Sequence, residues 1–249
     1  MRVAVMATCL GDAMFPEAPR ATVRLLRRLG VDVEVPGAQT CCGQPMVNSG
    51  YLDEAVPAVR RFVEAFDGFD VVVVPSGSCA GSVRHQHTLV ARRCGDRGLA
   101  EAVGRTAPRT VELSEFLVDV LGVVDVGAWF PHRVTYHPTC HSLRVLRVGD
   151  RPRRLLEAVG GIDLVDLPAA EECCGFGGTF AVKNADVSVA MGADKVRHVH
   201  ETGAEVLVAG DASCLMHVGG LLSRQRSRVR TMHLAEVLAA TADDPVVTG

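Results

Sequence analysis

The sequence predicts an α/β fold made of two tandem, duplicated units, each with a mostly parallel sheet flanked by helices. Short apolar, β-branched runs alternate along the chain with amphipathic segments, which is the order of strands and helices in parallel sheets. The run 71–74 consists only of valine, as expected for a parallel strand that is covered on both faces. The same order of elements then occurs a second time, with cysteines at corresponding places.

In the first half, β-branched or alternating runs predict strands and apolar stripes predict helices. The expected strands cover residues 2–8, 31–35 and 71–74. The expected helices cover residues 16–29, 53–66 and 113–121, and a further helix begins near residue 79. Around residues 122–131 the pattern restarts, so we predict two units that span residues 1–126 and 127–249.

The second half repeats this order. The expected strands cover residues 133–137, 162–167, 205–210 and 229–233. The expected helices cover residues 155–159, 185–200 and 234–238. In the helix over 185–200 we expect Val189, Ala193 and Val196 to face the protein interior, because they recur at helical spacing.

Eight of the nine cysteines form two sets of four, and each set has one cysteine, then an adjacent pair, then one more. The sets are Cys9, Cys41, Cys42 and Cys79, then Cys140, Cys173, Cys174 and Cys214. Corresponding members are 131, 132, 132 and 135 positions apart, which indicates an internal duplication. Each cysteine position follows a predicted strand, and ligands gather at the carboxyl ends of parallel strands. We therefore expect each set to converge at the carboxyl end of its sheet.

Composition excludes several classes of protein. The net charge of −3 and the 4% aromatic content argue against a surface for nucleic acid or for an anionic membrane. No apolar run reaches the roughly 18 residues of a membrane span, and the apolar N-terminus is better explained by a strand than by a signal peptide. We therefore expect a cytoplasmic protein, in which thiols stay reduced and clustered cysteines indicate metal or redox chemistry.

Four converging cysteines predict a metal centre in each unit. Thiolates repel one another, and burying them without a compensating positive charge is very costly. A helix N-terminus contributes only about 0.3–1 kcal/mol per charge, so a metal must supply the remainder. Four thiolates suit an iron–sulfur cluster or zinc. Adjacent cysteines are awkwardly placed to chelate one tetrahedral ion, which favours an iron–sulfur cluster over zinc and leaves a disulfide framework third.

The two cysteine units resemble the cysteine-rich CCG domain. The strings that carry this resemblance lie at residues 8–12, 41–45, 48–51, 77–79, 136–140, 173–180 and 213–214. The domain occurs twice in the B subunit of heterodisulfide reductase and in the iron–sulfur subunits of glycolate- and glycerol-3-phosphate-oxidising enzymes. The similarity spans nearly the whole chain and is nearest to the lactate utilization protein A group.

This resemblance implies an iron–sulfur electron-transfer subunit of a complex that oxidises L-lactate to pyruvate. It implies lactate utilization proteins B and C as partners, and an oxidoreductase subunit that is not catalytically complete alone. It also implies one iron–sulfur cluster per unit, with the eight paired and flanking cysteines as ligands. These are Cys9, Cys41, Cys42, Cys79, Cys140, Cys173, Cys174 and Cys214.

Both units depart from the heterodisulfide reductase pattern at the same place. That pattern ends each unit with C-x-x-C and uses five cysteines per non-cubane cluster, whereas Ser76 and Asp211 stand at the first position of that last motif. Three alternatives follow: a four-iron (4Fe-4S) cubane held by four cysteines, an oxygen ligand from Ser76 or Asp211, or a cap on the following helix. The departure disfavours a thiol/disulfide oxidoreductase of the heterodisulfide type. That activity and a zinc-stabilised assembly module are the alternative functions.

A few further side chains are candidates for supporting roles. His137, His141 and His217 lie near cysteines in the sequence and could bind metal, although such histidines more often have a structural or supporting role. Lys183 either offsets the negative charge of a cluster or lies on the surface, and Cys94 is expected to pack as a small apolar residue. No nucleotide fingerprint, flavin motif or nucleophile elbow is visible. Removal of hydride from lactate is therefore assigned to another component.

Overall fold

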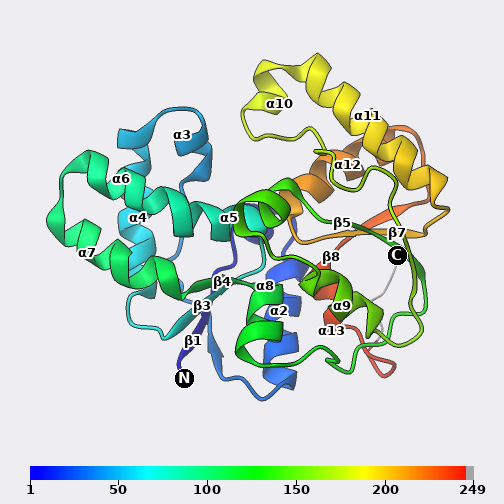
Figure 1. The fold of residues 1–249 in the computed structure, drawn as a ribbon, viewed down its shortest axis with the longest axis horizontal. Helices are drawn as coiled ribbons and strands as arrows, with labels where there is room; N and C mark the ends of the chain where they lie inside the picture. The colour runs from blue at the N-terminus through cyan, green and yellow to red at the C-terminus, as the bar shows by residue number, and fades with distance from the viewer. Residues whose placement is uncertain (245–249) are drawn as a thin grey trace.

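Residues 1–244 are described by the computed structural model, which consists of two four-stranded parallel sheets flanked by helices (Figure 1). The strand order is β2-β1-β3-β4 in the first sheet and β6-β5-β7-β8 in the second, and all pairings are parallel. The strands are β1 (Val3–Val5), β2 (Val33–Glu34), β3 (Val71–Val74), β4 (Thr110–Glu112), β5 (Arg133–His137), β6 (Asp163–Val165), β7 (Val206–Ala209) and β8 (Arg230–His233). The predicted fold class is confirmed.

Helices cover both faces of each sheet. Those of the first half are α1 (Cys9–Met14), α2 (Glu17–Arg28), α3 (Gln44–Asn48), α4 (Leu52–Phe66), α5 (Gly77–Gly81), η1 (Ser82–Gln86), α6 (His87–Cys94), α7 (Arg97–Thr106), η2 (Ala107–Arg109), α8 (Leu113–Glu115) and η3 (Phe116–Val120). Those of the second half are η4 (Ser142–Leu146), α9 (Arg151–Glu157), α10 (Phe180–Lys183), α11 (Ala185–Glu201), α12 (Ala212–Arg224) and α13 (Leu234–Ala239).

Each predicted strand is present, several are shorter than predicted, and β4 was not predicted. β3 and β5 have the predicted bounds, whereas the predicted strand over 2–8 is reduced to β1. β4 is absent from the prediction because three residues are too few to display an alternating pattern. The helix predicted over 113–121 is present as α8 followed directly by η3.

The buried face of α11 differs from the predicted one. Val196 is buried as expected, but Val189 is 44% exposed and Ala193 is also exposed, so the prediction was wrong for these two residues. The reason is a close approach of α11 to α12 at Gly192, where a Cβ atom would lie 2.3 Å from the side chain of Leu221. The side of α11 that carries Gly192 therefore faces α12, and Val189 and Ala193 lie outside that buried side.

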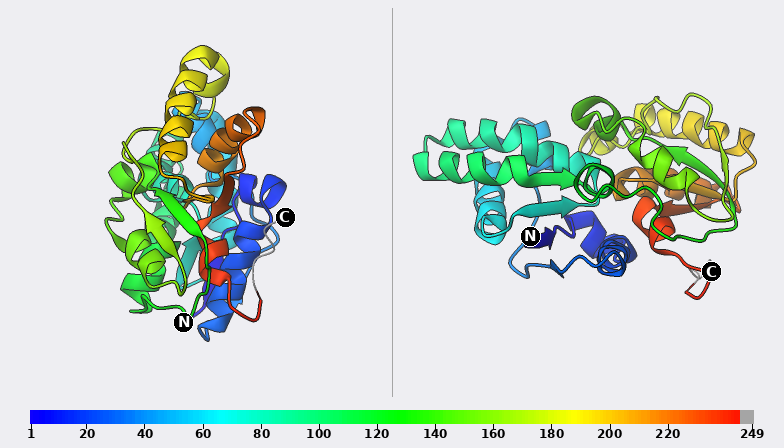
Figure 2. Two further views of the ribbon diagram at one scale, coloured as in Figure 1. Left: turned by 90° about the vertical axis from the view of Figure 1, so that its right-hand side faces the viewer. Right: turned by 60° about the horizontal axis from the view of Figure 1, so that its bottom comes forward.

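The two sheets share one hydrophobic core. The same cluster of buried residues includes Val3 and Val73 of the first sheet and Val134 and Val206 of the second. Helix α2 packs against α13, near the end of the described chain, and the two lie side by side in Figure 2. The halves are therefore joined by packing as well as by the chain that connects them.

Arg28, at the end of α2, also bridges the two halves. Its guanidinium donates hydrogen bonds to the carbonyl oxygens of Ala239 (2.7 Å) and Leu238 (2.6 Å), at the C-terminus of α13, and to that of Val126 (3.0 Å). A cation that binds the last carbonyls of a helix satisfies groups with no partner inside the helix. The sequence pattern alone places Arg28 on a solvent-facing side of α2, so this contact between the halves is a feature of the three-dimensional structure.

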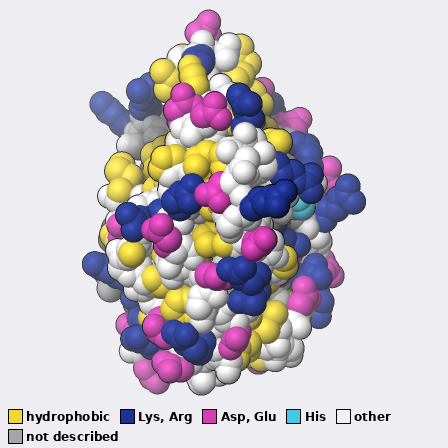
Figure 3. Space-filling model, turned by 90° about the vertical axis from the view of Figure 1, so that its left-hand side faces the viewer, with side chains coloured by type: hydrophobic (Ala, Val, Ile, Leu, Met, Phe, Trp, Pro, Cys, Tyr) yellow, Lys and Arg dark blue, Asp and Glu magenta, His cyan; other side chains and the backbone are white. Residues whose placement is uncertain are grey.

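The outer face of the first half carries charges of both signs (Figure 3). Exposed ion pairs there join Arg60 to Asp96 at 2.9 Å and Arg105 to Asp67 at 2.7 Å. Ion pairs this exposed each contribute roughly 0–1 kcal/mol to stability. Their main effect is to place positive and negative side chains next to one another on this surface. Among residues 1–244, no helix combines the length and the apolar character needed to cross a bilayer.

Glu112, at the end of β4, makes the free energy of unfolding depend on pH. Its side chain is 3% exposed and accepts a hydrogen bond from the backbone N–H of Ser114 at 2.7 Å. Burial raises the pKa of Glu112 from 4.5 to about 7. Between these values the folded chain keeps a proton that the unfolded chain loses. The free energy of unfolding therefore falls as pH rises from about 4.5 to 7, by up to about 3 kcal/mol.

We predict that Glu112→Gln removes this part of the pH dependence, because glutamine keeps an acceptor for Ser114 and does not titrate. The measurement is denaturant unfolding of both proteins at pH 5 and pH 7.5, under anaerobic reducing conditions and in the same metal state. Wild type should lose more stability than the variant between the two pH values. Equal losses would mean that Glu112 ionises in the folded protein as it does in water.

Candidate metal centre

The cysteines of each set lie just beyond the carboxyl ends of three strands. In the first half they follow β1, β2 and β3, and in the second half they follow β5, β6 and β7. In each sheet the chain passes from a central strand to an edge strand and then crosses back to the other side, which creates a switch point between the two central strands. Ligands of open parallel sheets bind at such points. The placement predicted from the sequence is therefore the one observed.

All eight cysteines line one cavity of about 470 Å³. The cavity lies where the two halves meet, and its lining includes residues of α3 and α10, which Figure 1 shows above α5 on opposite sides. Cys9 is exposed, while Cys42, Cys79, Cys174 and Cys214 are buried. Cys94 lies at the end of α6, where its thiol donates to the carbonyl oxygen of Ala91 at 3.3 Å, as expected for a cysteine outside both sets. The structure thus brings together the predicted site residues of both units.

The same turn follows each cysteine pair. The backbone N–H of Gly43 donates to the Cys41 Sγ at 3.4 Å, and that of Gly175 donates to the Cys173 Sγ at 3.4 Å. Both glycines have positive φ, 85° and 93°, which other residues rarely adopt. At Gly175 a Cβ atom would also lie 2.5 Å from the backbone oxygen of Ser188. The glycines therefore allow a backbone donor to approach the first sulfur of each pair.

Each set favours the thiolate form at the first cysteine of its pair. Hydrogen bonds from the thiols of Cys42 and Cys9 lower the pKa of Cys41 to about 2. Hydrogen bonds to Cys41 and Cys79, together with burial, raise the pKa of Cys42 well above its ordinary value. In the second set, hydrogen bonds from Cys140 and Cys174 likewise lower the pKa of Cys173 to about 2. A hydrogen bond from Cys174 also lowers the pKa of Cys214, to about 7. Thiols that share protons in this way become a tetrathiolate when a metal displaces those protons.

The set of sulfur donors fits a metal bound by thiolates. The distance between two of these sulfurs bears on the type of metal centre. The Cys9 and Cys41 sulfurs are 3.8 Å apart. Thiolates about 2.3 Å from a single tetrahedral zinc ion lie roughly 3.8 Å from one another. Sulfurs that bind separate irons of a cluster lie farther apart, so the Cys9 and Cys41 sulfurs would have to move apart to hold one. The cavity that joins the sets gives room for this movement.

Ser76 and Asp211 meet each other across the interface between the halves. The Ser76 hydroxyl accepts a hydrogen bond from the N–H of Cys79 at 3.2 Å and donates one to Asp211 Oδ1 at 2.5 Å. Asp211 also accepts from the hydroxyl of Ser78 (2.8 Å) and from that of Thr139 (3.0 Å), and its carboxylate contacts the N–H of Ser78. Asp211 therefore caps α5 of the other half. These bonds confirm the cap on the following helix for Ser76. The same interpretation was wrong for Asp211, whose side chain makes no capping bond to α12 and instead bonds to α5 of the other half.

The histidines near the cysteines differ in their surroundings. His137 is 2% exposed, and its ring nitrogens, together with the sulfurs of Cys174 and Cys214, supply donor atoms within 4.8 Å of one another. His141 Nδ1 lies 3.7 Å from the Cys140 Sγ. His217 instead contacts the backbone oxygen of Ser188 at 3.2 Å, away from the sulfurs. The structure therefore separates His137 and His141, which lie at the second set, from His217.

A buried lysine near the second set was not among the predicted residues. Lys195 of α11 is 1% exposed, and its ammonium donates to the carbonyl oxygen of Ala169 at 2.7 Å. Burial lowers the pKa of Lys195, while Glu172 and the thiolates of the second set act in the opposite direction. Lys183, the other lysine of the chain, is exposed on α10. The sequence signal that could have revealed the burial of Lys195 is that it shares one helix face with small residues.

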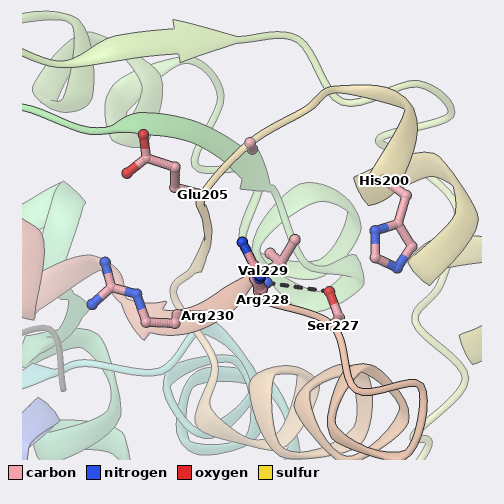
Figure 4. Close-up of a pocket in the computed structure, with 7 residues that line it drawn as sticks. His200, Glu205, Ser227, Arg228, Val229 and Arg230 are labelled. Atoms are coloured by element: carbon pink, nitrogen blue, oxygen red, sulfur yellow. Dashed lines mark hydrogen bonds between the residues drawn. The ribbon is translucent and has the colours of Figure 1, made fainter.

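A second pocket, of about 430 Å³, lies away from the cysteines (Figure 4). It is lined by the end of α11 and by residues just before β7 and β8, so it is at the amino ends of these strands. Glu205 in its wall is paired with His132 at 2.7 Å, and Ser227 accepts from the N–H of Val229 at 3.1 Å. Glu205 and Ser227 are thus already bonded within the protein, and the pocket lining contains no cysteine.

Comparison with known proteins agrees with this site. A family model described as a cysteine-rich domain, CCG, matches residues 3–84 and again residues 134–219. Lactate utilization protein A of Oceanobacillus iheyensis is 46% identical over 96% of this chain and 96% of its own length. Lactate utilization protein A of Geobacillus kaustophilus is 48% identical over 96% of this chain and 99% of its own.

Among solved structures, a solute-binding protein of an ABC transporter from Conexibacter woesei covers 98% of this chain and 72% of its own, at 17% identity and a TM-score of 0.26. That likeness is too weak to bear on the fold or the function. The matches to the family model and to the two relatives instead cover the cysteine sets and nearly the whole sequence. The chain belongs to the cysteine-rich CCG domain family and, within it, to the lactate utilization protein A family.

Proposed function

We propose that this chain is an iron–sulfur electron-transfer subunit of a complex that oxidises L-lactate to pyruvate. The observation that carries the proposal is the single cavity lined by eight cysteines from two duplicated units. The link to lactate comes from the relatives, which are named lactate utilization protein A. Subunits like lactate utilization proteins B and C are the proposed partners.

In this proposal each cysteine set holds one cluster. When bound, a cluster supplies a site that accepts and releases single electrons. The chain surrounds that site with buried thiols on one side and directs the N–H groups of Gly43 and Gly175 at one sulfur of each set. Such donors stabilise negative charge on the ligands and tune reduction potential. Since both sets line one cavity, the two metal-binding positions are neighbours at the interface of the halves.

The conversion of L-lactate to pyruvate releases two electrons and two protons. The eight thiols are the redox-relevant groups of the cavity described above, and we assign to this chain only the passage of the electrons. Removal of hydrogen from lactate is assigned to a partner that carries the necessary cofactor. This division makes the chain an oxidoreductase subunit that does not complete the reaction alone.

The test is the metal content of the whole chain purified without oxygen. The proposal predicts a brown protein that contains iron and acid-labile sulfide, with an electron paramagnetic resonance signal at low temperature after reduction. The two sets should each contribute to the iron content. A protein that stays colourless after anaerobic reconstitution with iron and sulfide would refute the iron–sulfur assignment.

The second candidate is a zinc-stabilised assembly module of the same complex. The specific observation in its favour is the 3.8 Å distance between the Cys9 and Cys41 sulfurs, which suits one tetrahedral ion without any rearrangement. It predicts one or two zinc ions per chain and no iron. The same metal analysis therefore separates the two candidates.

A further inference from the structure

The two cysteine sets are not surrounded by the same residues, although the halves are duplicated. His137 precedes Cys140 by three positions, and Met6 precedes Cys9 by three positions. Both lie at the carboxyl end of a central strand, β5 or β1, and both are buried, at 2% and 1% exposure. The second set therefore has an imidazole where the first set has a thioether.

A second difference lies on the helix that packs behind each cysteine pair. Gly43 faces Ala55 and Gly175 faces Ser188, which aligns α4 with α11 at an offset of 133 positions. At this offset Lys195 corresponds to Phe62, and both are buried. The duplication has thus been modified twice at the second set, and each time a polar, nitrogen-bearing side chain stands in place of an apolar one.

The ring nitrogens of His137 are unusual because neither has a hydrogen-bond partner among the described residues. A buried polar atom without a partner costs about 1–3 kcal/mol, and such atoms in native proteins usually indicate an ion or group that satisfies them. The sulfurs of Cys174 and Cys214 lie close by, with the donor atoms of all three residues within 4.8 Å of one another. A buried imidazole that lies beside two thiols and has no hydrogen-bond partner for its nitrogens within residues 1–244 is arranged as a ligand of a metal shared with those thiols.

We propose that His137 is a metal ligand of the second centre, together with Cys174 and Cys214, so that the two centres of this protein are chemically different. Imidazole nitrogen is a common ligand of both iron and zinc. The first centre, with Met6 at the corresponding place, is held by cysteine alone. The proposal builds on a metal being present at the second set, but it does not depend on whether that metal is iron or zinc.

His141 is the other imidazole that could produce a nitrogen signal at this set. Its Nδ1 lies 3.7 Å from the Cys140 Sγ, and its Nε2 lies 3.1 Å from the side-chain nitrogen of Gln44 in the other half. His141 thus already has a polar partner across the interface, unlike His137. His141→Gln is therefore the matched control for a change at His137.

The test uses the whole chain, purified anaerobically and labelled with ¹⁵N-histidine. If the metal is iron, pulsed electron paramagnetic resonance of the reduced protein should detect a directly bound ¹⁵N nucleus. If the metal is zinc, X-ray absorption at the zinc edge should contain the scattering pattern of an imidazole. Metal analysis reports first which case applies, so failure of the iron–sulfur proposal is distinguished from failure of this one.

His137→Met, which copies the residue of the first unit, should abolish the nitrogen signal and leave the first centre unchanged. His141→Gln should retain it. The proposal is overturned if the labelled wild-type protein gives no bound-nitrogen signal, or if His137→Met keeps that signal. Should His137→Met not fold, the wild-type spectrum together with that of His141→Gln still decides, since loss of the signal in His141→Gln would assign it to the wrong histidine.

Discussion

Replacing Cys174 by serine will remove metal from the second cysteine set and leave the first set loaded. Cys174 is buried, and hydrogen bonds to Cys173 and Cys214, with burial, raise the pKa of its thiol in the metal-free chain. Serine does not form an anion near neutral pH, and a buried hydroxyl is a poor substitute for a thiolate ligand. We expect the metal content per chain to fall by about half, with loss of only one of the two sets of spectroscopic signals.

The control for this experiment is Cys94→Ser, because Cys94 lies at the end of α6 and bonds only to the carbonyl oxygen of Ala91. That variant should keep the full metal content. The measurements are metal analysis and low-temperature electron paramagnetic resonance on anaerobic protein, with circular dichroism as the check of folding. If Cys174→Ser stays folded but loses the metal of both sets, the idea of two separable centres fails.

Replacing Asp211 by alanine will destabilise the whole chain, because its carboxylate links the two halves. The side chain is 2% exposed and accepts hydrogen bonds from Ser76, Ser78 and Thr139. Removing it leaves the N-terminus of α5 and three hydroxyl groups without their shared acceptor. Hydrogen bonds to a charged group contribute about 1.5–3 kcal/mol each, and a buried donor left unpaired costs about 1–3 kcal/mol. We expect a loss of about 3 kcal/mol in the free energy of unfolding.

Asp211→Asn is the matched control for this change. Asparagine keeps one acceptor oxygen at the same place, so it should cost about 1 kcal/mol, the net contribution of an ordinary hydrogen bond. Denaturant unfolding, monitored by circular dichroism under reducing conditions, measures both losses. Equal stability of Asp211→Ala and wild type would mean that the cost of burying the carboxylate cancels the bonds it accepts. The capping role assigned to Asp211 would then contribute nothing to stability.

Local patterns in the sequence were sufficient for most of the fold. The four-valine run gave β3 with its observed bounds, and helical spacing gave α2, α4 and α11 to within a residue or two. The alternation of strands and helices predicted the parallel sheets, and the repeated cysteine spacing predicted the duplication. The cysteines converge because residues that follow parallel strands lie at the same end of the sheet. The proposed boundary between residues 126 and 127 remains a prediction, since the hydrophobic core continues across it.

Contacts between distant residues had no local signature. Arg28 has the spacing of a solvent-facing residue on α2, yet it bonds to carbonyl oxygens about 210 positions away. Ser76 and Asp211 each stand at the start of a predicted helix, but Asp211 makes no capping bond to α12. It bonds instead to Ser76 and to α5, which depends on how the halves pack. His137 was identified as a candidate next to Cys140, whereas the structure places it beside Cys174 and Cys214. Lys195 was missed because a charged residue within a helix is ordinarily assigned to the solvent face.

The bridge from Arg28 to the end of α13 has a consequence for the ancestry of the chain. A tandem repeat begins as two copies that can each fold alone. The copies lose this independence once one copy supplies hydrogen bonds to a helix end of the other. In this protein each copy completes a helix end of the other, since Arg28 of the first copy bonds to the last carbonyls of α13 and Asp211 of the second bonds to the start of α5. We therefore expect two fragments cut between the copies to be more stable together than apart.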